Sequence, residues 1–379
     1  MLNRRSLRIK VMQNLFALEQ SREANYELSL DKIRETFRVN LNAMEVQDKA
    51  VLNEQCKEAL KLFEDVVANG TGSVDHEDKK VKKAVQEALK FNAEQSKKDQ
   101  TFYKKNLVGE VESIYAHYIA VLSLVPAFHD VAEADKKVSH KNFVENNWVK
   151  GLCESPALRK EASRLRKDWS DKPGIVKSWF RDIIRQDNEY LSYLDKKKPT
   201  QDDQRKFVNH LFRKVILGPT LINTHFEEEV LRWAEDRDIV KGMVEKTVKS
   251  YDPEAHDKLT LHTLSVNWED DRSFIQNLFE KGATLDQPFR KLIAANTRNW
   301  EVDRLPLTDR VILEMAIAEM ILFQNIPVKV SMNEYIELAK NYSTPKSRQF
   351  INGILDVISK ELKESGDLKK SGRGLMDNK

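Results

Sequence analysis

The chain has 379 residues, with 63 Lys and Arg against 60 Asp and Glu and only 12 Gly. This length allows two or three domains, and scarce glycine with 32% charged residues favours helices, because tight turns and strand bulges use glycine. No apolar run approaches the roughly 18 residues of a transmembrane helix. Cys56 and Cys153 are too few for a disulfide framework or a structural zinc site. We therefore expect an all-α, cytoplasmic protein of helical bundles, without metal or cofactor.

Differences in composition and in apolar periodicity divide the chain into four predicted zones. Residues 1–20 form a basic amphipathic helix that packs on a core, and residues 21–200 form a highly charged helical insertion. Residues 201–364 carry stronger apolar periodicity and form that helical core, whereas residues 365–379 look like a flexible tail. Because the formal net charge is only +3, any nucleic-acid binding must come from a local patch of cations.

An offset of 67 residues reveals a weak internal repeat between residues 203–237 and 270–304. Nine of these 35 positions are identical, and the motif Trp-x-x-Asp-Arg begins at Trp233 and again at Trp300. Two amphipathic helices also share Phe and Leu spacing by coincidence, so coincidence and duplication are both open. Duplication predicts two related helical units.

The first predicted helix, Arg4–Glu19, places its cations where a helix least favours them. Arg4, Arg5, Arg8 and Lys10 crowd its first turns, and no acid occurs before Glu19. Cations oppose the dipole at a helix N-terminus, so their presence indicates that they serve an external phosphate backbone. A solvated basic tail is the alternative. The other side of the helix carries an apolar stripe: Leu7, Val11, Leu15 and Leu18.

The segment from Leu305 to Phe323 is apolar almost all round and predicts a core helix. Glu319 is its anomaly, because it projects about 140° away from Glu314, on the apolar side of the helical wheel. A lone carboxylate there either pairs with a cation of a neighbouring helix or is exposed where a partner docks. The residues alone leave both interpretations open.

The predicted last helix begins with cations beside an aromatic ring. Phe350 follows Lys346, Ser347 and Arg348, an arrangement that fits base stacking combined with phosphate contacts. Packing of this ring in the core is the alternative. Gly353 lies mid-helix, where it costs about 1 kcal/mol relative to Ala, and close approach of another helix or of nucleic acid would explain it. Upstream, Ser331-Met-Asn-Glu334 predicts a capping box that starts the preceding helix.

Taken together, several motifs have the order and spacing of a known family. The N-terminus reads Arg4-Arg5-x-x-Arg8, followed by Val11-Met-Gln-Asn-Leu-Phe16. Near the other end come Ile326-Pro-Val-x-Val330-x-x-Asn333-Glu-x-x-Glu337-Leu-Ala-Lys340 and Ser347-x-x-Phe350-Ile-Asn-Gly-Ile-Leu-Asp356. The chain thereby resembles the N-utilisation substance B (NusB) family of transcription antitermination factors, over about 20 residues at the start and about 100 at the end.

The resemblance implies an all-α, non-enzymatic protein. It implies binding of boxA-type single-stranded RNA together with the small ribosomal subunit protein NusE, in a transcription elongation complex that promotes rRNA operon transcription. The residues implied at the RNA are Arg4, Arg5, Arg8, Ser347, Arg348 and Phe350, and we expect Lys346 to add a cation there. Phe16 and Glu319 match the surface for the ribosomal partner, which favours docking for Glu319. Glu314 and Ala318 depart from residues common in the family, so partner contacts are expected to differ.

Two other functions compete with this interpretation. A helical protein–protein scaffold would use the residues 21–200 and bind no RNA. An accessory domain for ribosomal RNA modification is disfavoured, because the sequence has no Gly-rich nucleotide loop, no GxxxxGK[ST] motif and no HExxH motif. Family members occur as monomers and as homodimers, so both oligomeric states are open, and no membrane association is expected.

Overall fold

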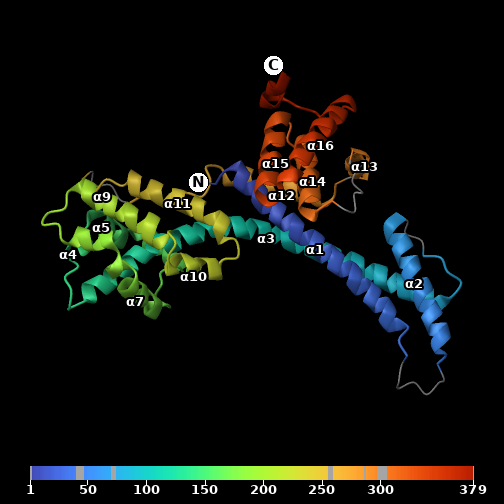
Figure 1. The fold of residues 1–379 in the computed structure, drawn as a ribbon, viewed down its shortest axis with the longest axis horizontal. Helices are drawn as coiled ribbons and strands as arrows, with labels where there is room; N and C mark the ends of the chain where they lie inside the picture. The colour runs from blue at the N-terminus through green and yellow to red at the C-terminus, as the bar shows by residue number, and fades with distance from the viewer. Residues whose placement is uncertain are drawn as a thin grey trace. The chain divides into compact units, whose positions relative to one another are not determined.

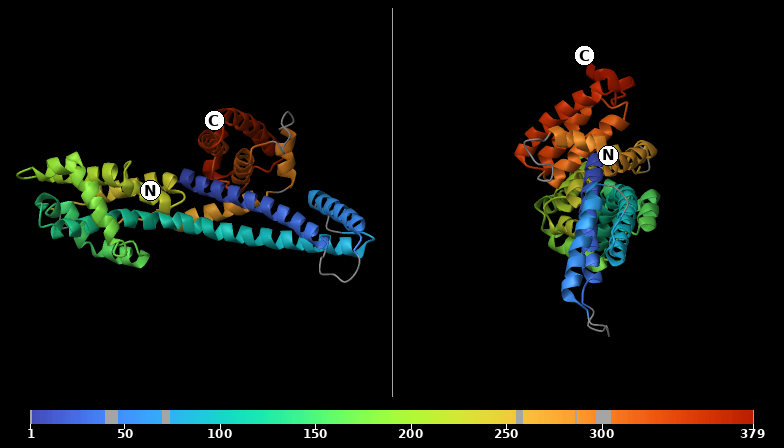
Figure 2. Two further views of the ribbon diagram at one scale, coloured as in Figure 1. Left: turned by 60° about the horizontal axis from the view of Figure 1, so that its bottom comes forward. Right: turned by 90° about the vertical axis from the view of Figure 1, so that its right-hand side faces the viewer.

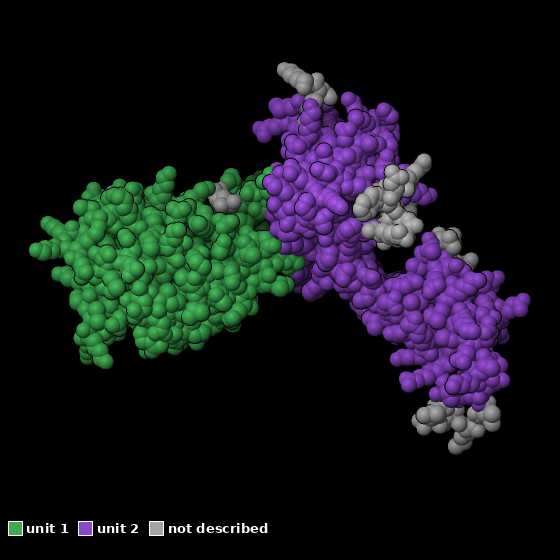
Figure 3. All heavy atoms as spheres, in the orientation of Figure 1, with its two compact units in different colours: residues 1–7, 109–272 green, residues 8–108, 273–379 purple. Residues whose placement is uncertain are grey.

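The computed structural model describes residues 2–39, 47–69, 74–254, 259–285, 287–296 and 305–378. Throughout these ranges the regular secondary structure is helical and no strand occurs, which confirms the predicted all-α class (Figure 1). The chain forms two compact units (Figure 3): unit 1 comprises residues 1–7 and 109–272, and unit 2 comprises residues 8–108 and 273–379. The divisions fall inside helices, so three helices contribute residues to both units.

The first part of unit 2 is built from α1 (Arg4–Thr36), α2 (Lys49–Asn69) and the beginning of α3 (Lys79–Ala134). Within the unit, α1 and α3 run side by side in opposite directions (Figure 2), and Asn25 donates a hydrogen bond to Asp99 across them (2.6 Å). The helix predicted to end at Glu19 therefore continues for 17 more residues. The reason is a second apolar cluster that its extension shares with α2 and α3: Leu30, Ile33, Phe37, Leu52, Ala59, Phe63, Val81 and Val85.

The second part of unit 2 is a helical bundle. It contains the C-terminal part of α12 (Trp268–Ala283), then α13 (Gln287–Asn296), α14 (Leu307–Leu322), α15 (Val328–Tyr342) and α16 (Pro345–Glu364). Every residue of α14 from Val311 to Met320 is buried, as expected for a core helix. The helix α15 packs against both α14 and α16.

One local prediction in this bundle is corrected. The helix α15 begins at Val328 after Pro327, so Ser331 is a buried residue of its first turns instead of its cap. The physical reason is that the Ser331 hydroxyl hydrogen-bonds a side chain of α14. The segment predicted as a flexible tail contains a 3-10 helix, Gly372–Asn378, and Lys370 Nζ donates to the carbonyl of Phe323 (3.0 Å).

Unit 1 surrounds the C-terminal part of α3 with short helices. They are α4 (Lys141–Val144), α5 (Asn147–Glu154), α6 (Pro156–Leu165), α7 (Pro173–Asp182), a 3-10 turn (Ile184–Gln186), α8 (Asn188–Leu194), α9 (Gln201–His210), a π-helix (Leu211–Ile216), α10 (Leu221–Glu229) and α11 (Trp233–Ser250). Aromatic residues dominate the core, with Tyr193 stacked on Phe207 at 4.2 Å between ring centroids. Contrary to the expectation from sequence, α3 contains a stretch long and apolar enough to cross a membrane, but 67% of that stretch is buried, as in a core helix.

The predicted zones do not map one to one onto the units. Residues 21–108 lie in unit 2 and residues 109–200 in unit 1, while the predicted core, residues 201–364, is divided after Arg272. The zone boundaries therefore stay a prediction from composition.

The helix bounds follow the 67-residue offset of the predicted repeat. The continuous helical segment 201–216 and helix α12, residues 268–283, differ by 67 at both ends. Phe207 and its counterpart Phe274 are both buried, as are Leu211 and Leu278. The second Trp-x-x-Asp-Arg motif, residues 300–304, lies outside the described residues, so duplication stays a prediction.

Candidate nucleic-acid interface

A buried ion pair joins α1 to α14 in unit 2. Arg8 donates two hydrogen bonds to Glu319, from Nε to Oε2 and from Nη2 to Oε1, each 2.7 Å long. The side chains are 3% and 0% exposed. This is a bidentate, charge-assisted pair, the geometry in which guanidinium and carboxylate interact most strongly.

Four further residues surround this pair, and one of them, Glu334, places Oε2 3.5 Å from Nη1 of Arg8. The hydroxyls of Ser331 and Tyr335 donate to the two carboxylate oxygens of Glu319, at 2.7 and 2.9 Å. Burial and the negative charge of Glu319 raise the pKa of Tyr335 well above its usual value, so the phenol stays a donor. Burial alone would lower the pKa of Arg8, but the hydrogen bonds and charge of Glu319 outweigh it, so the guanidinium stays protonated. Arg8 also lies over the ring of Phe274, 5.6 Å from its centroid.

This geometry decides between the two interpretations of Glu319. Its carboxylate pairs with a cation of a neighbouring helix and is not exposed to a docking partner. The expected direct contact of Arg8 with RNA is corrected for the same reason, since its side chain lies inside the bundle. Both residues fix how α1 packs, and neither presents its polar atoms on the surface.

Sequence reasoning missed Ser331 and Tyr335 as partners of this pair. One signal pointed to them: the residues are four apart, so their hydroxyls lie on one face of α15. The identity of the acceptor was not readable, because Glu319 lies on another helix.

Arg4 and Arg5 lie in the first turn of α1. Arg4 forms an ion pair with Asp270, and its Nε lies 3.6 Å from Asp271, at the start of α12 within unit 1. Arg5 is exposed. A phosphate at this position would compete with two carboxylates for Arg4 but would reach Arg5 from solvent.

The first turn of α16 presents the other predicted RNA contacts. Lys346 and Arg348 are exposed, and Phe350 is half-buried. Ser347 is buried, and its backbone N–H donates to the N-cap hydroxyl of Thr344 (3.1 Å). The cap fixes the start of the helix, where the helix dipole favours an anion. Cations, a helix N-terminus and a partly exposed ring thus come together here.

Gly353 continues this face of α16 one turn beyond Phe350. It is exposed, and a Cβ added to it would meet nothing within 4 Å. Helix packing therefore does not explain this glycine, and close approach of an external backbone is the explanation left from the sequence analysis.

Phe16 lies on α1 with 38% of its surface exposed. A large exposed ring on a helix is a common feature of protein-binding surfaces. It is the one predicted partner contact that the structure leaves accessible, since Glu319 is buried.

The fold and this site define a class: an all-α protein whose C-terminal bundle is joined to its first helix by a buried ion pair. Comparison of the sequence with models of known protein families identifies one family. Residues 236–360 match the model of the NusB family, so the chain carries a NusB-family domain preceded by a long N-terminal region. Arg8 lies outside the matched range but pairs with Glu319 inside it.

Three similar curated proteins are each named transcription antitermination protein NusB. The protein of Chloroherpeton thalassium is 52% identical over 85 residues, covering 22% of this chain and 40% of the relative. The protein of Salinibacter ruber is 41% identical over 105 residues, which cover 28% of this chain and 66% of the relative. The protein of Natranaerobius thermophilus is 38% identical over 92 residues, which cover 24% of this chain and 66% of the relative. The chain thus matches between two fifths and two thirds of each relative. No solved structure matches it.

Proposed function

We propose that this chain is an RNA-binding transcription antitermination factor that recognises boxA-type single-stranded RNA. Two facts support the proposal: the matched relatives are named transcription antitermination proteins, and the NusB-family match, residues 236–360, includes the cationic first turn of α16. The carrying observation is this turn, with Lys346 and Arg348 exposed beside the half-buried ring of Phe350. It works by binding and not by catalysis.

The chemistry of this turn suits an unpaired RNA strand. Phosphates meet Lys346 and Arg348 at the positive end of the α16 dipole, which gives salt-dependent affinity. An unstacked base lies against Phe350, and the missing side chain at Gly353 lets the RNA backbone approach the helix. Arg5 supplies a further cation from α1, while Arg8 acts as a positioning residue through Glu319.

The proposed partner is the small ribosomal subunit protein NusE, which contacts Phe16 on α1. RNA and NusE then hold the factor in a transcription elongation complex on rRNA operons, which places it in the cytoplasm. The partner surface uses the exposed ring of Phe16 but not the buried carboxylate of Glu319.

The test is fluorescence anisotropy with a boxA-type RNA and a scrambled RNA, with and without NusE. We expect selective binding that NusE tightens. Lys346→Asp should weaken binding and lower the slope of log affinity against log salt by about 0.7 to 1, because one phosphate contact is lost. Lys363→Asp is the matched control, since Lys363 is an exposed lysine at the other end of the same helix.

Two results would contradict the proposal. Equal affinity for both RNAs would remove the sequence recognition, and no RNA binding with retained NusE binding would leave a protein–protein scaffold. Unchanged salt dependence in Lys346→Asp would refute only the proposed contact between Lys346 and a phosphate.

A further inference from the structure

Unit 1 carries a groove lined only by residues with charged or polar groups. It lies along the exposed face of α9 and the π-helix, opposite the C-terminal part of α11, and measures about 660 Å³. Three other polar residues, Asp202, His210 and Glu245, share the lining. Asn209 also lines the groove. We call it the basic groove after its five cationic residues: Arg205, Lys206, Arg213, Lys214 and Lys249.

Cations outnumber acids in the basic groove. Two arginines and three lysines face two carboxylates, a formal excess of 5 − 2 = +3, as large as the excess of the whole chain. Asp202 is shared between Lys206 at 2.6 Å and Arg205 at 3.4 Å, and Glu245 pairs with Arg213 at 2.9 Å. Lys214 and Lys249 are exposed, and neither forms an ion pair with any residue that the structure describes.

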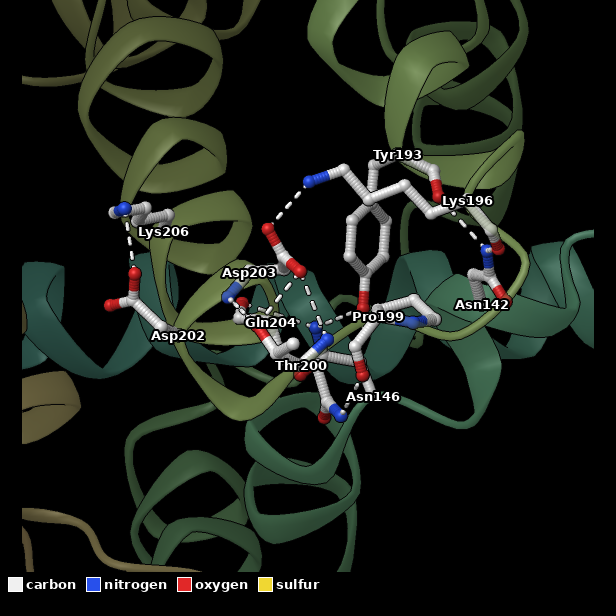
Figure 4. A network of polar contacts seen from close by, with 10 residues as sticks. All are labelled: Asn142, Asn146, Tyr193, Lys196, Pro199, Thr200, Asp202, Asp203, Gln204 and Lys206. Carbon is white, nitrogen blue, oxygen red and sulfur yellow. Dashed lines mark hydrogen bonds and ion pairs between the residues drawn. The ribbon is translucent and has the colours of Figure 1, made fainter.

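The groove is built on a fixed helix. Thr200 caps α9: its hydroxyl accepts from the N–H of Asp203 (3.2 Å), and the Asp203 carboxylate accepts from the N–H of Thr200 (2.9 Å), as Figure 4 shows. The same view shows Lys196 reaching Asp203 and Asn146 meeting the Tyr193 hydroxyl. A capped, cross-linked N-terminus holds the cationic face of α9 in one orientation.

The π-helix Leu211–Ile216 lies in the middle of the cationic face. Its opposite side is buried through Leu211, Phe212 and Val215, while Arg213 and Lys214 point outward. The turn that follows requires glycine, because a Cβ on Gly218 would lie 1.9 Å from the carbonyl oxygen of Lys214. π-Helical turns are rare and occur frequently at functional sites.

We propose that the basic groove binds the phosphate backbone of single-stranded RNA that flanks the boxA-type sequence. Guanidinium groups and lysines bind phosphate oxygens. The one ring in the lining, His210, is held by Asp187 at 3.0 Å, and the lining contains no Leu, Ile, Val, Met, Phe, Tyr or Trp to anchor a protein partner. Binding there is therefore independent of base sequence and strongly salt-dependent. This inference rests on the proposed function, because the flanking strand belongs to the RNA whose boxA-type sequence the chain is proposed to bind.

The experiment compares two RNAs in anisotropy titrations of the full chain over a salt series. One RNA carries the boxA-type sequence alone, and the other carries it with unrelated single-stranded sequence on both sides. The groove variant is Lys214→Glu/Lys249→Glu. The control is Lys160→Glu/Lys177→Glu, which makes the same charge change at two exposed lysines of unit 1 outside the groove. Thermal melting checks that both variants fold.

The native chain and the control should bind the extended RNA more tightly than the short one. In the groove variant this gain should be lost, and the salt slope for the extended RNA should fall by about 1.4, or about 0.7 for each phosphate contact on a single strand. Its affinity for the short RNA should be unchanged.

An extension that gives no gain in the native chain, or a gain that the groove variant keeps, would overturn the inference. Loss of binding to core RNA polymerase in the groove variant, with no effect of RNA length, would instead assign the groove to an acidic protein surface. Failure of the native chain to bind the short RNA would refute the proposed function and leave the extended RNA as a separate test of the groove.

Discussion

At the scale of single residues, Arg8 and Glu319 show how opposite charges are accommodated inside a bundle. Each would be strongly destabilising if buried alone, but together with the hydroxyls of Ser331 and Tyr335 they satisfy one another. The sequence indicates that Glu319 needs an explanation. It does not reveal Arg8 as the answer, because the two are 311 positions apart and charge alone does not specify a partner.

Removing Arg8 should destabilise the fold. Arg8→Met leaves the Glu319 carboxylate buried without its cation, which should lower the free energy of unfolding by about 3–5 kcal/mol. Chemical denaturation measures this, with Arg5→Met as the control, because it makes the same change at an exposed position of α1 and should cost less than about 0.5 kcal/mol. Native stability in Arg8→Met together with lost RNA affinity would instead make Arg8 a direct RNA contact.

Cys153 should be an unreactive thiol. Burial raises its pKa to about 12, with nearby carboxylates contributing, so the thiol stays protonated below that pH and the nucleophilic thiolate is scarce. Iodoacetamide at pH 8, followed by mass spectrometry, should label Cys153 slowly in the native chain and rapidly after denaturation. Rapid labelling of the native chain would contradict the burial.

At the scale of elements, the sequence patterns identified α1, α14, α15 and α16 but not always their ends. The predicted apolar stripe of α1 is buried: Leu7, Val11, Leu15 and Leu18. In α16 a stripe of the same kind is buried: Ile351, Ile354, Leu355, Ile358 and Leu362. The end of α1 was misplaced by 17 residues, because its extension is stabilised by α2 and α3, and such tertiary packing is not visible in a local pattern. The start of α15 was misplaced because a serine can bond across helices as well as cap one.

Gly353 allows the proposed role of α16 to be tested against stability. Gly353→Ala should raise the free energy of unfolding by up to about 1 kcal/mol, because alanine favours helix and the added Cβ meets no neighbour within 4 Å. The same substitution should weaken RNA binding if the RNA backbone approaches this position. Thermal melting and anisotropy measure the two effects separately. Higher stability with unchanged RNA affinity would show that the glycine does not serve RNA.

At the scale of the whole molecule, the all-α class followed from composition and periodicity, and the two units did not. Unit 1 combines Met1–Leu7 with Gly109–Arg272, and no local signal reports that segments so distant in sequence fold together. The candidate site was predictable at α16, where cations and an aromatic ring are neighbours in sequence. The basic groove was not, because Lys249 and Glu245 join the cations of residues 205–214 only when α9 and α11 pack together.

The most direct test of the proposed function is transcription in vitro. A template carries a boxA-type leader ahead of a terminator, and read-through by RNA polymerase is measured with NusE present, with and without this chain. A second template has the leader scrambled. The account predicts that the chain increases read-through on the first template and not on the second. Equal read-through with and without the chain, under conditions where it binds the RNA, would contradict an antitermination function.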